Sequence, residues 1–221
     1  MKIIARIKSP FPDKFAIPRQ SGLTETEGII VFEPEYRNEA ALRGIEEYSH
    51  LWLIWGFSEI SKKEWSPTVR PPRLGGNKRI GVFATRSPYR PNPIGLSSVK
   101  LIKKEETNEG VVLRVSGADL MDGTPIYDIK PYLPYTDCHN DAVGGFSDKV
   151  LSYSLEVIIP SELMKNLSSD EAKEIESILS QDPRPAYIDE PERVYGFKYK
   201  DKEVKFKVAN NTATLLQITK R

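Results

Sequence analysis

Residues that build disulfide frameworks and metal centres are scarce in this chain of 221 residues, which holds one cysteine, Cys138, and two histidines. One cysteine excludes an internal disulfide framework and is typical of a reducing compartment. A zinc site needs about four Cys, His or carboxylate ligands in defined spacing, so Cys138 beside His139 predicts no metal centre. A Cys/His nucleophile pair with His50 or His139 as base stays formally open, although nothing around Cys138 resembles such a setting.

Long apolar runs and nucleotide-binding glycine motifs are also missing. The N-terminal sequence MKIIARIKSPF has too short an apolar run for a signal peptide. No stretch approaches ~18 apolar residues, so we expect no membrane span and a soluble, cytoplasmic protein. Neither a GxGxxG sequence after a strand nor a Walker loop occurs, so any cofactor is held in another way.

Acidic residues are absent from one long segment, although the whole chain has a net charge of only +1. Residues 65–104 contain no Asp or Glu, whereas acids gather between Ser168 and Glu192. This distribution predicts a positive face rather than a positive composition. The basic residues of the acid-free segment are Arg70, Arg73, Lys78, Arg79, Arg86, Arg90, Lys100, Lys103 and Lys104.

The same segment carries rigid turns, "RPPRLGGN" and "YRPNPIG", whose prolines preset the backbone. Forked arginine donors on a fixed backbone suit phosphates, which favours a nucleic-acid partner bound in a salt-sensitive way. Trp65 and Tyr89 can stack on unpaired bases or pack within turns. The alternative for the whole segment is a solvated face with prolines that blunt strand edges.

Many short apolar strands separated by Gly and Pro predict a mainly β fold: an antiparallel β-barrel with a small C-terminal α+β domain. We expect a β-barrel domain over 1–159 and the α+β domain over 160–221, with short helices at Glu35–Ile45 and Ser161–Gln181. The expected strands are Met1–Ile7, Gly28–Glu33, Tyr48–Phe57, Ile80–Thr85, Leu96–Ile102, Val111–Ser116, Ile126–Ile129, Leu151–Ile159, Phe197–Lys200, Lys205–Val208 and Thr212–Ile218.

Several long motifs resemble one known family. They are "DKFAIPRQ", "YSHLWLIWGF", "WSPTVRPPRLGGNKRIGVFATRSPYRPNPIGLS", "DLMDGTPIYDIKPYLPY" and "QDPRPAY". Together they resemble the TrmO-type, or TsaA-like, S-adenosylmethionine-dependent tRNA methyltransferases. The resemblance implies an antiparallel β-barrel, a homodimer with the methyl donor near the subunit interface, and methylation of the exocyclic nitrogen of threonylcarbamoyl-adenosine next to the anticodon.

The resemblance also implies site residues. It places the donor on Pro18, Arg19, Gln20, His50, Leu51, Arg86, Leu96, Leu120, Met121, Asp122 and Gly123. Arg184 and Tyr187 are expected to contact the substrate, and Arg70, Arg73 and Arg90 to meet the RNA backbone of the anticodon loop.

Each of these assignments has a structural alternative. Asp122 is either an acid for the donor's cationic sulfonium or an Asx-type turn residue. Arg19 or Arg86 pairs with the donor's carboxylate or forms a surface ion pair, and His50 is a ligand contact or a hydrogen-bonded core histidine. Arg184 with Tyr187 is alternatively an interdomain ion pair with a packed ring.

Methyl transfer is an in-line displacement that needs no metal and depends on alignment in a dry site. Asp122 and Tyr132 are candidates for a base, and the catalytic residue stays unassigned. Two other functions are open: a noncatalytic RNA-binding β-barrel module, and a methyltransferase of the same fold that acts on a small molecule.

Overall fold

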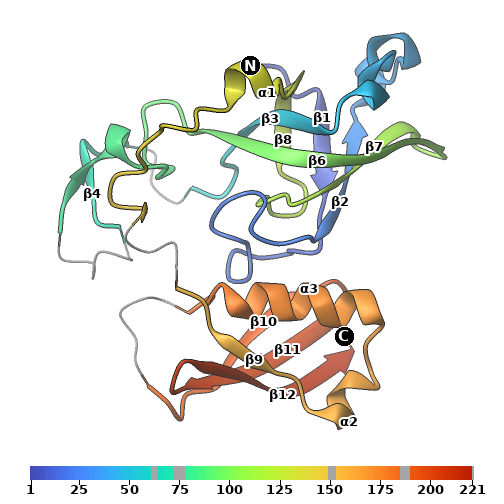
Figure 1. Ribbon diagram of the computed structural model, residues 1–221. Coiled ribbons are helices and arrows are strands. Elements are labelled where there is room, and N and C mark those ends of the chain that lie inside the picture. Colours follow the sequence, from blue (N-terminus) through green and yellow to red (C-terminus); the bar gives the residue numbers. More distant parts are fainter. Residues whose placement is uncertain (61–63, 72–77, 149–152, 185–189, 221) are drawn as a thin grey trace.

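The computed structural model describes residues 1–60, 64–71, 78–148, 153–184 and 190–220, which form two main β-sheets and a small two-stranded sheet, with short helices around them (Figure 1). The larger sheet has six antiparallel strands. They are β1 (Ala5–Lys8), β2 (Glu27–Phe32), β3 (His50–Gly56), β6 (Ile94–Thr107), β7 (Gly110–Ser116) and β8 (Pro125–Pro131).

The six strands pair in the order β1-β2-β7-β6-β3-β8, and β8 pairs again with β1, so the order returns to its start. Alternate residues of β3 point inward, because neighbouring side chains in a strand face opposite sides. Leu51, Leu53 and Trp55 therefore lie in the core of this sheet, whereas Trp52 and Ile54 are only half-buried.

The second sheet has the order β10-β11-β12-β9 and is covered on one face by α3 (Figure 1). Ser168 begins α3 with a capping box to Glu171, and the buried side of this helix is apolar. The elements are β9 (Glu156–Ile158), α2 (Ser161–Met164), α3 (Ser169–Ser180), β10 (Tyr195–Tyr199), β11 (Lys202–Ala209) and β12 (Thr212–Lys220).

The loop after β1 ties the two sheets together. Phe11 and Ala16 belong to the buried core of the C-terminal sheet, although they follow a strand of the six-stranded sheet. The Lys200 amide donates to the Pro10 carbonyl at 3.1 Å across the same junction. The loop thus fills a core that the C-terminal residues do not complete by themselves.

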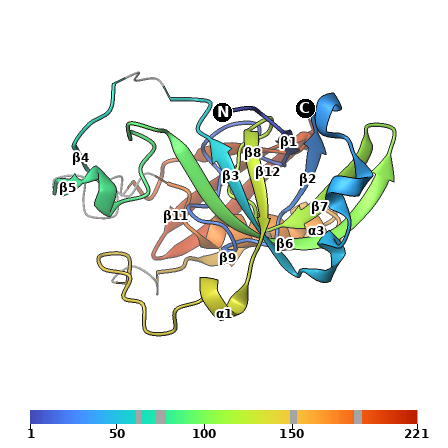
Figure 2. The same cartoon turned by 90° about the horizontal axis from the view of Figure 1, so that it is seen from above.

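A small arm extends from the six-stranded sheet (Figure 2). We use "the arm" for residues 64–71 and 78–90, which hold β4 (Thr68–Val69), β5 (Ile80–Gly81) and the 3₁₀ turn η5 (Val82–Ala84). The two strands pair antiparallel, with Thr68 opposite Gly81 and Val69 opposite Ile80.

The mainly β class expected from the sequence is confirmed, with four differences in detail. The helix expected at 35–45 is a series of 3₁₀ turns, η1 (Pro34–Tyr36), η2 (Glu39–Leu42) and η3 (Ile45–Glu47). Extended backbone at Asn38 and Arg43, with ψ of 112° and 126°, and a left-handed φ of 82° at Gly44 separate the turns. The helix expected at 161–181 is split ahead of the Ser168 cap. The strand expected at 80–85 ends after Gly81 and continues as η5.

The fourth difference concerns the boundary expected after residue 159. β9 pairs in parallel with β12, so this strand belongs to the C-terminal sheet rather than to the first domain. One further short helix, α1 (Pro134–Asp137), follows β8. Within the ranges given above, no helix is long and apolar enough to cross a membrane.

Candidate functional site

A pocket of about 590 Å³ opens where five segments meet, within the range of about 300–1,000 Å³ typical of small-molecule sites. The segments are the loop after β1, the end of β3, the end of the arm, the start of β6 and the loop before β8. The pocket-lining residues are Lys14, Ile17–Gln20, Trp52, Trp55–Ile60, Thr85, Arg86, Pro88–Arg90, Ile94–Leu96, Asp119, Met121 and Thr124.

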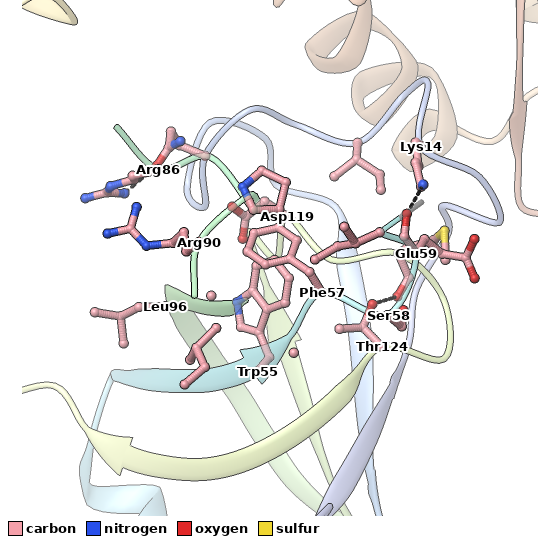
Figure 3. A pocket seen from close by; sticks show the side chains of 18 of the residues that line it. Lys14, Trp55, Phe57, Ser58, Glu59, Arg86, Arg90, Leu96, Asp119 and Thr124 are labelled. Atoms are coloured by element: carbon pink, nitrogen blue, oxygen red, sulfur yellow. Dashed lines mark hydrogen bonds between the residues drawn. The ribbon is translucent and has the colours of Figure 1, made fainter. Parts of the chain in front are cut away.

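Two aromatic rings form the middle of the pocket wall (Figure 3). The centroids of Trp55 and Phe57 lie 4.4 Å apart, and Trp55 is nearly buried. Gly95 lies opposite Trp55 in the pairing of β3 with β6, and a Cβ added at Gly95 would lie 2.2 Å from the indole. Trp55 can therefore occupy its place in the pocket wall only because residue 95 is a glycine.

A chain of hydrogen bonds joins this wall to a carboxylate. Trp55 Nε1 donates to Ser97 Oγ at 2.9 Å, and Ser97 Oγ donates to Asp119 Oδ1 at 2.5 Å. Burial raises the pKa of Asp119 above its ordinary value, against the lowering effects of the Ser97 hydrogen bond and the Arg86 charge. The pocket thus combines aromatic surface with a partly desolvated acid.

Cationic side chains lie at both ends of the pocket: Arg86 and Arg90 at one end, Lys14 with the Glu59 carbonyl at the other (Figure 3). Arg86 donates to the Gln20 side-chain oxygen, which links the arm to the loop after β1. Arg19 Nη2 donates to the Asp182 carbonyl at 2.6 Å. One pocket residue is thereby held by the C-terminal part of the chain.

Six of the eleven residues expected to bind the donor line this pocket, although they are far apart in the sequence. They are Pro18, Arg19, Gln20, Arg86, Leu96 and Met121. The side chains of Leu51 and Leu120 are instead buried in the core of the six-stranded sheet. His50 lies outside the pocket lining, with Nδ1 2.9 Å from Ser49 Oγ and its ring against Tyr132.

Asp122 and Gly123 form a turn outside the pocket lining. The Ser9 amide donates to Asp122 Oδ1 at 3.0 Å, and Gly123 has a φ of 76°. Asp-Gly is strong turn chemistry, because Asp accepts local backbone N–H groups and Gly adopts positive φ. The Asp122 side chain accepts from Ser9, which is far away in the sequence, so it ties this turn to the loop after β1, and its donor contact stays a prediction.

The residues expected to contact RNA differ in how exposed they are and in whether they already make hydrogen bonds within the protein. Arg70 is exposed on the arm, whereas Arg73 and Tyr187 lie outside the described residues. Arg90 is occupied within the arm, because its Nη1 donates to the Val82 and Thr85 carbonyls at 3.0 and 2.7 Å. Arg90 therefore braces the arm, and its contact with RNA phosphates stays a prediction.

Arg184 is paired internally. Its Nε and Nη2 donate to the two carboxylate oxygens of Asp182 at 2.8 and 3.0 Å, and the two side chains are 10% and 9% exposed. Tyr153 donates to the same carboxylate at 2.7 Å. This geometry fits the alternative that Arg184 forms an ion pair, but the pair lies within the C-terminal part and not between domains. The hydrogen bond between the two parts of the chain comes from Arg19.

Sequence reasoning missed Trp55, Phe57, Gly95 and Asp119 as parts of the site. Asp119 and Gly95 occur inside motifs that were singled out, so their position was a signal. Trp55 and Phe57 also lie in such a motif, YSHLWLIWGF, but its apolar character indicates a core strand. Across the described ranges, no cluster of three or more His, Cys, Asp or Glu residues is placed to hold a metal ion.

The fold and the pocket define a mainly β protein whose candidate ligand site lies between loops and strand ends rather than at a Gly-rich turn. Residues 6–138 match the tRNA-methyltransferase O N-terminal domain, and residues 152–221 match the TrmO C-terminal domain. The chain therefore belongs to the tRNA-methyltransferase O family.

Relatives and solved structures agree with this assignment. The chain is 41% identical over 216 residues to a tRNA (adenine(37)-N6)-methyltransferase of Escherichia coli (strain K12), covering 94% of this chain and 92% of the relative. It is 48% identical over 169 residues to a protein of the same name from Eikenella corrodens, covering 76% and 95%. A crystal structure of TrmO from Pseudomonas aeruginosa superposes with a TM-score of 0.77 at 34% identity, covering 98% and 97%.

Proposed function

We propose that this chain is an S-adenosylmethionine-dependent tRNA methyltransferase that methylates the exocyclic nitrogen of threonylcarbamoyl-adenosine next to the anticodon. One observation carries the proposal: six residues from separate family motifs converge on a single pocket of about 590 Å³. The Escherichia coli relative named for methylation of adenine 37 in tRNA matches 94% of the chain.

The chemistry of the pocket suits the methyl donor. S-adenosylmethionine supplies an electrophilic methyl group on a cationic sulfur. Asp119 and the Trp55 ring offer the negative charge and the aromatic face that stabilise such a cation. Arg86 is placed to pair with a carboxylate, because a guanidinium binds carboxylates with two parallel hydrogen bonds.

The contribution of the protein to the reaction is positioning and exclusion of water. Methyl transfer requires nucleophile, carbon and leaving group in line, and holding them so removes an entropic barrier. The Trp55–Ser97–Asp119 hydrogen bonds fix the wall of the pocket before any ligand enters. Asp122 and Tyr132, the candidates for a base, do not line the pocket, so no base is assigned.

The finer expectations form part of this proposal. The closed pairing of six strands is the β-barrel of the methyltransferase domain, and residues 160–221, with β9 added, are a substrate-contacting domain. The protein acts as a homodimer in the cytoplasm on the tRNA anticodon loop. Donor contacts by His50, Leu51, Leu120, Asp122 and Gly123 stay a prediction and would come from outside the pocket described here.

Methyl incorporation into RNA tests the proposed function. Labelled S-adenosylmethionine is supplied with two matched anticodon stem-loops, one with threonylcarbamoyl-adenosine and one with plain adenosine. We expect label only in the modified RNA. No label in either RNA, with RNA still bound, would favour the noncatalytic RNA-binding module. Label in a small nucleoside, indifferent to salt and to the stem-loop, would favour a small-molecule methyltransferase.

A further inference from the structure

Two large aromatic side chains lie exposed side by side on the arm. Trp65 is 50% exposed and Phe83 is 70% exposed. Their ring centroids are 6.4 Å apart, and the ring planes are within 23° of parallel. Neither residue lines the pocket or belongs to either buried core. Two large exposed aromatic rings that contact each other are more often an interaction site than single scattered apolar residues are.

The arm holds Phe83 in place from beneath. Phe83 is the middle residue of η5, and Arg90 donates to carbonyls on either side of it, those of Val82 and Thr85. The Arg90 guanidinium also lies 5.5 Å from the centroid of the Phe83 ring. An arginine used in this way fixes the turn and polarises the ring that it contacts. The aromatic pair is therefore built before a partner arrives.

The surroundings of the pair are positive. Trp65 and Phe83 lie within the segment 65–104, which has no acidic residue, and the one acid of the arm is Glu64, directly before this segment. Arg70, Lys78 and Arg79 are exposed on the same arm, and Arg79 donates to Thr68 Oγ1 at 2.9 Å. Among the residues that the structure describes, none of these three makes an ion pair. Their charge is thus available to an anionic partner.

The pair is also close to the candidate site along the chain and in space. The segment after η5, with Thr85, Arg86 and Tyr89, lines the pocket. Arg90 lines the pocket as well and contacts Phe83, so a single side chain lies between the two. A partner resting on the aromatic pair would extend toward the pocket mouth.

We infer that Trp65 and Phe83 form a stacking platform for an unpaired base of the anticodon loop. This base lies near the adenosine that is methylated. The inference rests on the proposed function, since it names a contact of that RNA. Every base presents a π-face, and aromatic platforms beside basic side chains are the recurring way to bind single-stranded RNA. The exposed rings provide stacking, and the adjacent Arg70, Lys78 and Arg79 provide attraction to phosphates.

Equilibrium binding of the modified anticodon stem-loop to the full chain tests the platform. Stacking of one base is lost in Phe83→Ala, so we expect an affinity about five- to a hundredfold lower. Phe83→Tyr keeps an aromatic face and restores most of the affinity. Tyr48→Ala, which removes an exposed aromatic residue outside the arm, leaves the affinity unchanged.

Salt dependence separates stacking from charge. Phe83→Ala keeps the slope of log affinity against log salt, because no phosphate contact is lost. Arg79→Ala lowers that slope by about 0.7 for a single-stranded contact. If a base stacks on Trp65, RNA binding is expected to quench tryptophan fluorescence, and Trp65→Phe is expected to remove this quenching while it preserves stacking. The quenching is thereby assigned to Trp65 rather than to Trp52 or Trp55.

Several results would overturn the platform. They are unchanged RNA affinity in both Phe83→Ala and Trp65→Ala, no RNA binding by the wild type, or dissociation of a dimer by Phe83→Ala with RNA affinity retained. The last result would assign the pair to an interface between two copies of the chain. Failure of the proposed function is distinguishable, because the wild type would then bind RNA through Phe83 and transfer no methyl group.

Discussion

Gly95→Ala is expected to lower donor affinity at least tenfold and the free energy of unfolding by about 1–3 kcal/mol, the usual cost of overpacking. The new methyl group would lie 2.2–2.6 Å from three atoms of the Trp55 indole, closer than packed carbon atoms approach. Trp55 is nearly buried, so its ring has little room to retreat. Its displacement would pull Nε1 from Ser97 Oγ and loosen the support of Asp119.

Equilibrium binding of labelled S-adenosylmethionine and urea unfolding measure the two effects of Gly95→Ala. Gly196→Ala is the matched control, because Gly196 also lies in a strand and a Cβ there would meet its nearest neighbour at an ordinary 3.6 Å. Donor affinity equal to that of the control would show that the Trp55 wall does not shape the donor site.

Arg184→Ala is expected to cost about 3 kcal/mol of folding free energy, because it leaves the Asp182 carboxylate buried without its cationic partner. The surface pair of Lys220 with Asp201 is the control, and Lys220→Ala should cost under about 1 kcal/mol. Chemical unfolding at neutral pH measures both. A cost for Arg184→Ala as small as that of the control, together with weaker RNA binding, would restore the substrate-contact assignment.

The cost of Arg184→Ala should also depend on pH in a definite direction. Burial favours a higher pKa for Asp182, but hydrogen bonds from Arg184 and Tyr153 outweigh it, so the pKa lies below its ordinary value. A lowered pKa contributes stability that is fully present above the unfolded value of about 3.9 and is lost as pH falls through the folded value. The stability difference between wild type and Arg184→Ala should therefore shrink below about pH 4.

The hydrogen bonds that Asp182 makes with Arg184, Tyr153 and Arg19 affect the pocket as well as the stability of the fold. Asp182 has a φ of 48°, which Asp tolerates better than most residues, and this conformation follows the end of α3. Its carbonyl accepts from Arg19, a pocket residue. Loss of Arg184 thus disturbs a contact between the C-terminal part and the candidate donor site.

Local sequence patterns predicted most of the strands but could not predict which strands pair with one another. A long aromatic and aliphatic run predicted β3, whose inward residues Leu51, Leu53 and Trp55 form the core. The return of β8 to β1 depends on two residue pairs, Ala5 with Ile126 and Arg6 with Pro125, which no local pattern reveals. The helix expected at 35–45 is interrupted at Asn38, Arg43 and Gly44, because extended or left-handed backbone at these positions outweighs the apolar side of a short segment.

Part of the candidate site was likewise predictable from the sequence, and part depends on contacts between distant segments. Motif resemblance predicted Arg19, Gln20 and Arg86, and the structure brings all three to the pocket. The roles of Arg90 and Asp119 depend on carbonyls and hydroxyls contributed by other segments, such as Val82 O and Ser97 Oγ. Strand register and loop conformation decide which carbonyls and hydroxyls lie beside a side chain. The residue type of Arg90 alone therefore could not predict that it donates to carbonyls of the arm.

The central claim is that the pocket beside Trp55 holds the methyl donor, and donor binding to two matched variants tests it most directly. Leu96→Trp adds a large side chain at the pocket rim, and Ile102→Trp adds the same side chain on the same strand outside the pocket lining. The two positions are 54% and 41% exposed, so both variants should fold. We predict that labelled S-adenosylmethionine binds the wild type and Ile102→Trp equally and binds Leu96→Trp at least tenfold more weakly. Equal binding to all three proteins, or none to the wild type, would contradict the claim.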